Sequence, residues 1–186
     1  MKLNGLLLAL FFVCGVAAAQ TPSFEKGDKV INLGVGIGGN YYSGFTSGIN
    51  RTPFLSASLD IGIVDGIGDK GSIGIGGIVG FSSVKWNDRD YGYKQSNILI
   101  GPRGTFHYPL VDKLDTYAGL TLGYHIVSYK YTGSFGNSGT FGTNVSAVYF
   151  SGFIGARYYF TDSFGIMLEL GSGGLSLANF GVALKF

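Results

Sequence analysis

The sequence predicts an all-β protein, an eight-stranded antiparallel up-and-down β-barrel that spans a membrane. Three observations predict it: eight segments of alternating apolar and small or polar residues, a glycine-rich and charge-poor composition, and an export signal before the first segment. Charged residues make up 13% of the 186-residue chain, and 33 residues are Gly. That charged share is about half of what soluble domains carry. Among sheets, only a closed barrel satisfies its backbone in lipid.

Residues 1–19 are predicted to form a cleaved signal peptide. Lys2 supplies the positive start, an apolar run follows, and three alanines precede the cleavage point. Residues 20–186 would then form the barrel domain. Cleavage also removes Cys14, the one cysteine of the chain, so the mature protein would have no disulfide and no thiolate site. Cys14 also permits a lipoprotein, although the residues before it lack the small side chain of a lipidation signal.

The predicted strands alternate with a period of two, and none shows the 3.6-residue spacing of a helix. The first four cover residues 31–38, 55–63, 73–81 and 97–108, with outward apolar side chains that begin at Ile31, Leu55, Ile73 and Ile98. The last four cover residues 118–126, 150–160, 166–171 and 180–186, with outward side chains that begin at Ala118, Phe150, Ile166 and Phe180. Segments of about ten residues have the length of a tilted membrane-spanning strand. Many inward positions are glycine, which leaves room for larger polar side chains in a narrow barrel.

The connections are predicted to alternate in length. Those on one side, residues 39–52, 85–92, 128–144 and 173–174, are expected to be loops, mostly long ones. Those on the other side, residues 65–71, 109–113 and 161–163, are expected to be turns. An even number of strands returns both termini to the turn side, which in outer-membrane barrels is the periplasm.

The chain resembles the small eight-stranded outer-membrane barrels, the OmpX-like and OmpA-transmembrane-domain-like group. The resemblance rests on Gly101-Pro102-Arg103-Gly104, Gly155-Ala156-Arg157-Tyr158-Tyr159-Phe160, the inward Glu169 and the closing Val182-Ala183-Leu184-Lys185-Phe186. It implies a place in the outer membrane of a Gram-negative bacterium, with both termini periplasmic. It also implies insertion by the outer-membrane assembly machinery, with Phe186 as part of the assembly signal. The expected surroundings are outer-membrane lipid and lipopolysaccharide, and the expected state is a monomer.

Ionisable side chains on the inward face are predicted to form a charge network in the lumen, made of Asp60, Arg103, His107, Arg157, Glu169 and Lys185. Arg157 and Glu169 flank one tight turn, so a cross-strand pair between them is expected. Two interpretations follow. The network either satisfies itself and fills the lumen, because buried charges need partners, or it forms a gate or narrow ion path. The first interpretation is favoured.

Aromatic residues are predicted to gather in the outer loops among Gly, Ser and Asn: Tyr41, Tyr42, Trp86, Tyr91, Tyr93, Tyr129 and Tyr131. One interpretation is an aromatic girdle at the membrane interface. The other is a contact surface for a partner, since Tyr with Ser, Gly and Asn suits adaptable recognition. The girdle is favoured.

The function expected from these observations is a structural or surface-interaction role, with a lumen filled by side chains and no enzymatic activity. No cofactor is expected, because no helix follows either GxGxxG match, at residues 34–39 and 66–71. No metal site is expected, because His107 and His125 lie far apart on a hairpin. A net charge of +2 without a Lys/Arg cluster argues against nucleic acid. The alternatives are a small porin-like channel or carrier and a soluble, lipocalin-like periplasmic barrel, which would carry its apolar residues inside.

Overall fold

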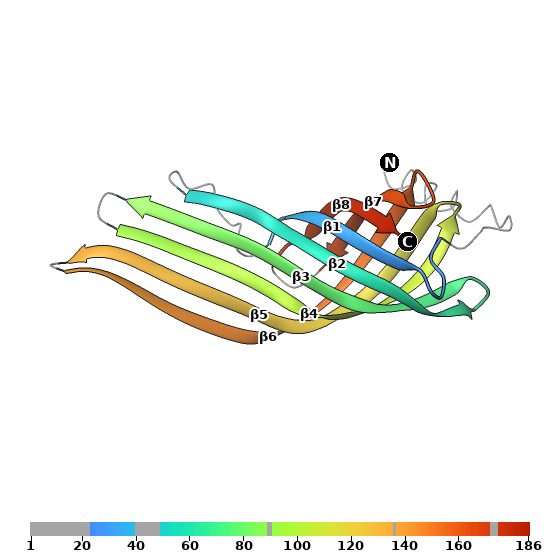
Figure 1. The fold of residues 1–186 in the computed structure, drawn as a ribbon, viewed down its shortest axis with the longest axis horizontal. Coiled ribbons are helices and arrows are strands. Elements are labelled where there is room, and N and C mark those ends of the chain that lie inside the picture. The colour runs from blue at the N-terminus through green and yellow to red at the C-terminus, as the bar shows by residue number, and fades with distance from the viewer. Residues whose placement is uncertain (1–22, 40–48, 89–90, 136, 172–174) are drawn as a thin grey trace, which may run out of the picture.

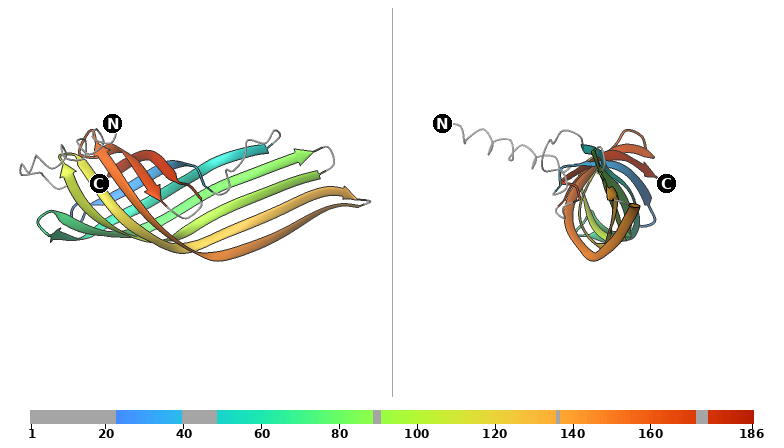
Figure 2. Two further views of the ribbon diagram at one scale, coloured as in Figure 1. Left: turned by 180° about the vertical axis from the view of Figure 1, so that it is seen from behind. Right: turned by 90° about the vertical axis from the view of Figure 1, so that its left-hand side faces the viewer.

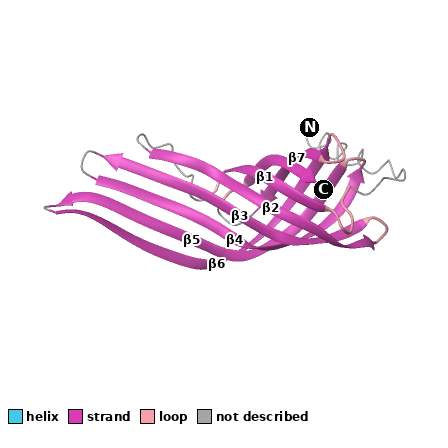
Figure 3. Cartoon of the chain, in the orientation of Figure 1, coloured by secondary structure: helices cyan, strands magenta, loops and turns pink. Residues whose placement is uncertain are grey.

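The computed structural model describes residues 23–39, 49–88, 91–135, 137–171 and 175–186. Eight antiparallel strands pair in sequence order, and β8 pairs with β1 to close the barrel (Figures 1 and 2). The predicted fold class is therefore confirmed. The strands are β1 (Lys29–Ile37), β2 (Ile49–Ile67), β3 (Gly71–Asp88), β4 (Tyr91–Val111), β5 (Leu114–Phe135), β6 (Asn137–Tyr159), β7 (Phe164–Gly171) and β8 (Ala178–Lys185). Strands and short connections make up the described chain, in which we find no helix able to cross a membrane (Figure 3).

The two faces of the barrel wall differ as the alternation predicts. Leu120 and Leu122 on β5 are each 56% exposed, while Arg157 on β6 is fully buried. On β4, outward apolar side chains run from Ile98 to Tyr108, and on β6 they run from Phe150 to Tyr158. Ten residues of strand span about 34 Å, or about 25 Å once tilted, which is the height of the apolar band of an outer-membrane barrel.

The connections at the end near the termini are tight turns, as predicted. Lys113, between β4 and β5, takes a φ of 63°, and Asp69, between β2 and β3, takes 87°. Between β6 and β7, the Thr161 hydroxyl accepts the backbone N–H groups of Ser163 and Phe164. These side-chain caps and left-handed residues let the chain reverse in a few residues.

The connections at the opposite end correct the prediction of long loops. Residues 85–92 and 128–144 belong mainly to strands, and β5 pairs with β6 as far as Phe135 and Asn137. The apolar alternation stops near Ile126, but the backbone ladder does not, because Tyr, Thr and Ser suit a solvated strand. Residue 49 already belongs to β2, so the predicted loop 39–52 is also shorter than expected. Residues 173–174 lie outside the described part.

The long hairpins form a sheet that projects past the short strands (Figure 1). We call the part of β3–β6 beyond Phe81, Ile98, Ile126 and Ser146 the projecting sheet. Strands β1, β7 and β8 have only eight or nine residues, whereas β3 to β6 have 18 to 23. Among the described residues, β7 pairs with β6 only from Phe153 onward. The outer part of β6 therefore has β5 as its one partner strand there.

Candidate functional site

Inward positions of strands that are far apart in sequence bring charged side chains together near the barrel axis. Asp60 comes from β2, Arg103 and His107 from β4, Asp115 from β5, Arg157 from β6 and Glu169 from β7. Each of these residues is at most 7% exposed. Their closeness follows from the strand register, because glycines such as Gly76, opposite Arg103, leave space beside them.

Arg157 is the centre of this network. Its Nε donates to the Asn32 Oδ1 at 3.0 Å, its Nη1 donates to the Asp115 Oδ2 at 3.0 Å, and its Nη2 donates to Asp60. Its guanidinium carbon lies 4.3 Å from the centre of the Tyr117 ring. One side chain thus ties β6 to β1, β2 and β5 across the lumen. A buried guanidinium needs such complete pairing to offset its desolvation.

Arg103 forms the second crossing of the lumen. Its Nη2 donates to the Glu169 Oε1 at 2.7 Å, and its Nε lies 3.1 Å from the Asp60 Oδ1. Asp60 therefore bridges both arginines. Glu169 also accepts the Tyr117 hydroxyl at 2.9 Å. The two arginines face three carboxylates, those of Asp60, Asp115 and Glu169, so every ionic group in the network has an opposite charge beside it.

His107 is held by both ring nitrogens. Its Nδ1 lies 2.8 Å from the Asp115 Oδ1, and its Nε2 lies 2.8 Å from the Thr105 Oγ1. Because Asp115 is an acceptor, the imidazole Nδ1 carries the proton toward it. An alcohol, an imidazole and a carboxylate in this order also occur in hydrolase triads. Here Thr105 is only 4% exposed, and the Phe24 ring stacks on His107 at 3.9 Å. These hydrogen bonds fix the three side chains, and the Thr105 hydroxyl is shielded from solvent.

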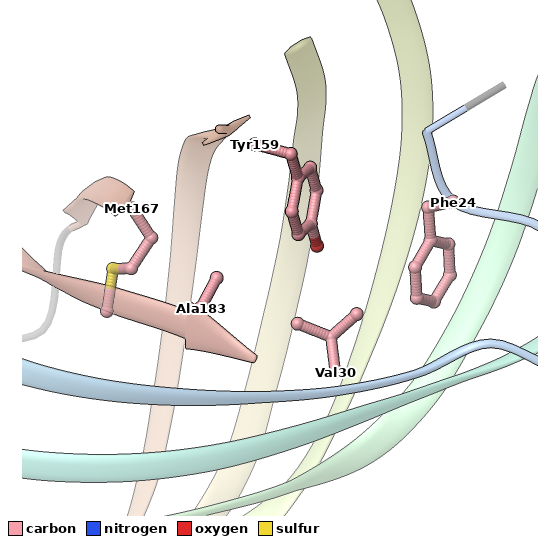
Figure 4. Close-up of a cluster of buried hydrophobic side chains, with 5 residues drawn as sticks. All are labelled: Phe24, Val30, Tyr159, Met167 and Ala183. Carbon is pink, nitrogen blue, oxygen red and sulfur yellow. The ribbon is translucent and has the colours of Figure 1, made fainter. Parts of the chain in front are cut away.

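Phe24 closes the end of the lumen near the termini. It is 2% exposed and belongs to a buried apolar cluster with Val30, Tyr159, Met167 and Ala183 (Figure 4). Ser72 holds it in place, since the Ser72 hydroxyl donates to the Phe24 carbonyl at 2.9 Å. The segment before β1 therefore turns back into the barrel.

On the other side of the network, a second apolar cluster narrows the lumen. Phe54, Leu99 and Leu175 form it, and all three are at most 4% exposed. A cavity of about 50 Å³ lies between this cluster and the pair of Arg103 and Glu169. Such a space has room for a few water molecules at most.

Two expectations about the network are wrong in detail. Arg157 does not pair with Glu169: the register places Gly155 opposite Glu169 and Met167 opposite Arg157. The two side chains instead turn to different partners, Arg157 to Asp60 and Asp115, and Glu169 to Arg103. Lys185 stands apart at the barrel end, where its Nζ lies 3.4 Å from the Asp28 Oδ2 and donates to the Ser23 carbonyl.

Sequence reasoning missed Asp115, Tyr117 and Phe24. It also did not predict that Thr105 contacts His107. A signal existed for Asp115 and Tyr117, because extending the alternation of Gly119 and Thr121 toward the turn places both on the inward face. Asn32 was predicted to face inward but was not included with the charged groups. No periodicity predicts Phe24, because it lies outside the strands.

The aromatic residues of the projecting sheet correct the girdle interpretation. Trp86 pairs with Tyr93, and Tyr93 pairs with Tyr131, so all three lie on one face. Tyr129 lies two residues from Tyr131 and on the same face. This face continues the inward face of β4 and β5, so these side chains do not point toward lipid. The Tyr93 ring lies 5.2 Å from Tyr131 and 6.3 Å from Tyr129.

Other predicted residues are placed as follows. Phe186 closes the barrel through its backbone, which exchanges hydrogen bonds with Lys29, and it is 66% exposed. The signal peptide, Tyr41 and Tyr42 lie outside the described residues, as does the side chain of Tyr91.

The two histidines lie apart along the β4–β5 hairpin. His125 lies opposite Leu99, with its Nε2 3.2 Å from the Asn97 Oδ1, while His107 lies opposite Tyr117. We find no cluster of metal-ligand residues in the described part of the chain.

One likeness to a solved structure agrees with the fold. No protein-family model and no curated protein sequence matches the chain. Among solved structures, it is similar to Ail, the attachment invasion locus protein of Yersinia pestis, in complex with the heparin analogue sucrose octasulfate. The identity is 11%, with 87% of this chain and 99% of that chain covered and a TM-score of 0.54. This likeness supports the eight-stranded barrel fold.

Two further structures match with lower TM-scores. A second Ail structure of Yersinia pestis is 16% identical, with 87% of this chain and 99% of that chain covered and a TM-score of 0.45. The N-terminal β-barrel domain of Pseudomonas aeruginosa OprF is 12% identical, with 88% of this chain and 100% of that chain covered and a TM-score of 0.44.

Proposed function

We propose that this chain is an integral outer-membrane protein that acts at the cell surface and does not conduct solutes through its lumen. The observation that carries the proposal is a lumen crossed by two buried arginines, each ion-paired with two carboxylates, inside a wall whose outer face is apolar. An apolar outer wall is favourable in lipid. Side-chain pairing across the lumen makes the barrel rigid, and a rigid barrel can hold the projecting sheet in place for a binding partner.

The apolar belt supports a membrane location over the soluble, lipocalin-like alternative. A soluble barrel buries its apolar side chains inside and exposes polar ones. Here Leu168 is 47% exposed, and its neighbour Glu169 is 7% exposed. In water, so continuous an apolar surface would drive aggregation.

The paired lumen supports a closed barrel over the channel alternative. Arg157 and Arg103 connect β1, β2, β4, β5, β6 and β7 through side chains, and apolar clusters lie on both sides of them. An ion passing through would have to displace a guanidinium from its carboxylates. That step costs several kcal/mol in a buried site.

The projecting sheet supports a surface role. It offers an aromatic inner face and a β6 edge that, among the described residues, pairs only with β5, and an extended polypeptide can add to such an edge. On this proposal the termini are periplasmic, the predicted signal peptide is removed, and Phe186 contributes to assembly at the strand that closes the barrel.

Membrane fractions and planar bilayers test the proposal. We expect the protein in the outer-membrane fraction, with different gel mobility before and after boiling, and no steady single-channel openings after reconstitution. Recovery in the soluble periplasmic extract would reject the membrane location. Stable openings would reject the closed lumen.

A further inference from the structure

The outward face of β3, β4 and β5 carries three rows of residues, which begin at the border of the projecting sheet and change outward from apolar to hydroxyl to lysine. The register of β3, β4 and β5 aligns Phe81, Ile98 and Ile126 as the last apolar row. Two residues further out it aligns the hydroxyl row of Ser83, Ser96 and Ser128. Two residues beyond that it aligns the lysine row of Lys85, Lys94 and Lys130.

The lysine row places three like charges on directly opposite positions. Neighbouring strands lie about 4.8 Å apart, and like charges at such pairs repel each other. Lys85 and Lys130 are exposed, and Lys94 is partly exposed. Among the described side chains, no carboxylate forms an ion pair with any of the three. An anionic group between adjacent amines would remove this repulsion.

The height of the row identifies the anion that fits. Rows on one face are about 7 Å apart along a strand, so the lysine backbone lies about 14 Å beyond the last apolar row and about 10 Å beyond it along the membrane normal after tilting. The headgroup layer extends about 5–8 Å past the hydrocarbon on each side. A lysine side chain that bends back therefore reaches this layer. Of the intervening serines, Ser96 and Ser128 are partly exposed and can donate hydrogen bonds to the same group, whereas the Ser83 hydroxyl is buried beside Thr52.

We propose that Lys85, Lys94 and Lys130 form a binding site for the phosphate groups of an anionic lipid in the outer leaflet. The site rests on the proposed function, because it requires the apolar belt to be embedded in a bilayer. The lipid would place its acyl chains along the belt and its phosphates across the row. This occupant is favoured over a soluble anion because the lysines lie on the same face as the apolar belt, two rows beyond its last row.

The test uses the refolded protein in mixed detergent micelles, titrated with bisphosphorylated lipid A. The triple variant Lys85→Gln, Lys94→Gln and Lys130→Gln removes the row. Its matched control replaces three exposed lysines near the other end, Lys26, Lys29 and Lys113, with Gln. Each lysine near an anionic surface strengthens binding by about fivefold, so we expect the first variant to bind about 100-fold more weakly and the control to change by less than about threefold.

Each outcome has a distinct meaning. Equal loss in both triple variants, or no loss in the first, would overturn the site. Binding of inorganic phosphate or sucrose octasulfate at the row as tightly as lipid A would overturn the lipid as its occupant. Gel mobility before and after boiling shows that each variant is folded. If the unaltered protein fails to insert into phosphatidylcholine vesicles, the proposed membrane location is wrong. If it inserts but the lysine substitutions leave its affinity for lipid A unchanged, only the lipid site is wrong.

Discussion

The barrel end near the termini and the projecting sheet follow the same two-residue alternation, yet they satisfy their polar groups in different ways. Near the termini, every charge of the network meets a partner inside the wall, and Arg157 alone contacts three other strands. On the projecting sheet, lysines and aromatic side chains stay exposed or half-exposed, and the outer part of β6 pairs only with β5 among the described residues. The difference indicates that the first region lies in the membrane and the second in water. In lipid, polar groups must pair within the protein, whereas in water a sheet edge and charged side chains can stay exposed.

The two regions should also contribute to different properties, the lumen network to stability and the projecting sheet to binding. A network in which one side chain anchors several strands loses much when a member is removed, because the remaining charges stay buried without partners. Truncating an exposed side chain of the projecting sheet, such as Lys130 or Tyr131, should cost little. Stability should therefore depend on the lumen, and binding should depend on the projecting sheet.

Arg157→Ala should have the largest effect on the stability of the barrel. It leaves Asp60 and Asp115 buried without this cation, so we expect a loss of about 3–5 kcal/mol in the free energy of unfolding. Urea titration in vesicles, followed by gel mobility before boiling, measures it. Lys130→Ala on the projecting sheet is the control, with an expected change below about 0.5 kcal/mol. Equal urea midpoints for the two variants would disprove the contrast.

Phe24→Ala should have the next largest effect. The ring is 2% exposed and stacks on His107, so its removal leaves a cavity worth about 3 kcal/mol of stability. Phe150→Ala is the matched control, because Phe150 is 66% exposed on the outward face. The same urea titration compares them. A larger loss for Phe150 would mean that Phe24 does not close the barrel end as the structure indicates.

The two regions also differ in how far their structure could be predicted from the sequence. The strands near the termini could be placed because lipid on one side and a narrow lumen on the other leave a clear alternation, as in Ile98, Ile100 and Arg103. The ends of the hairpins could not, because Tyr129 and Thr132 face water or a broad inner surface and show no apolar period. Partners inside the lumen were also beyond prediction: alternation fixes which way Arg157 points, but barrel closure decides that it meets Asp60 and not Glu169.

Gly101→Ala should reveal how tightly the strands pack around the narrow lumen. A Cβ at Gly101 would meet the backbone of Gly123 and Leu122 on the neighbouring strand, whereas a Cβ at Gly104 would meet nothing within 4 Å. We expect Gly101→Ala to lower stability by about 2 kcal/mol and Gly104→Ala to leave it within about 0.5 kcal/mol. Urea midpoints in vesicles measure both. If both alanines are tolerated, the wall is less tightly packed than the described backbone implies.

Apart from the control variants, the smallest effect should come from Tyr131→Ala, and Tyr117→Ala gives it a matched comparison on the same strand and face. Tyr131 is 50% exposed and contributes one ring contact with Tyr93, so its loss should cost about 0.5–1 kcal/mol. Tyr117 is 4% exposed, donates to Glu169 and lies beneath Arg157, so its loss should cost about 3 kcal/mol. Because type, strand and face are the same, only depth along β5 separates the two. Similar urea midpoints for both variants would show that the network does not distinguish the two halves of the strand.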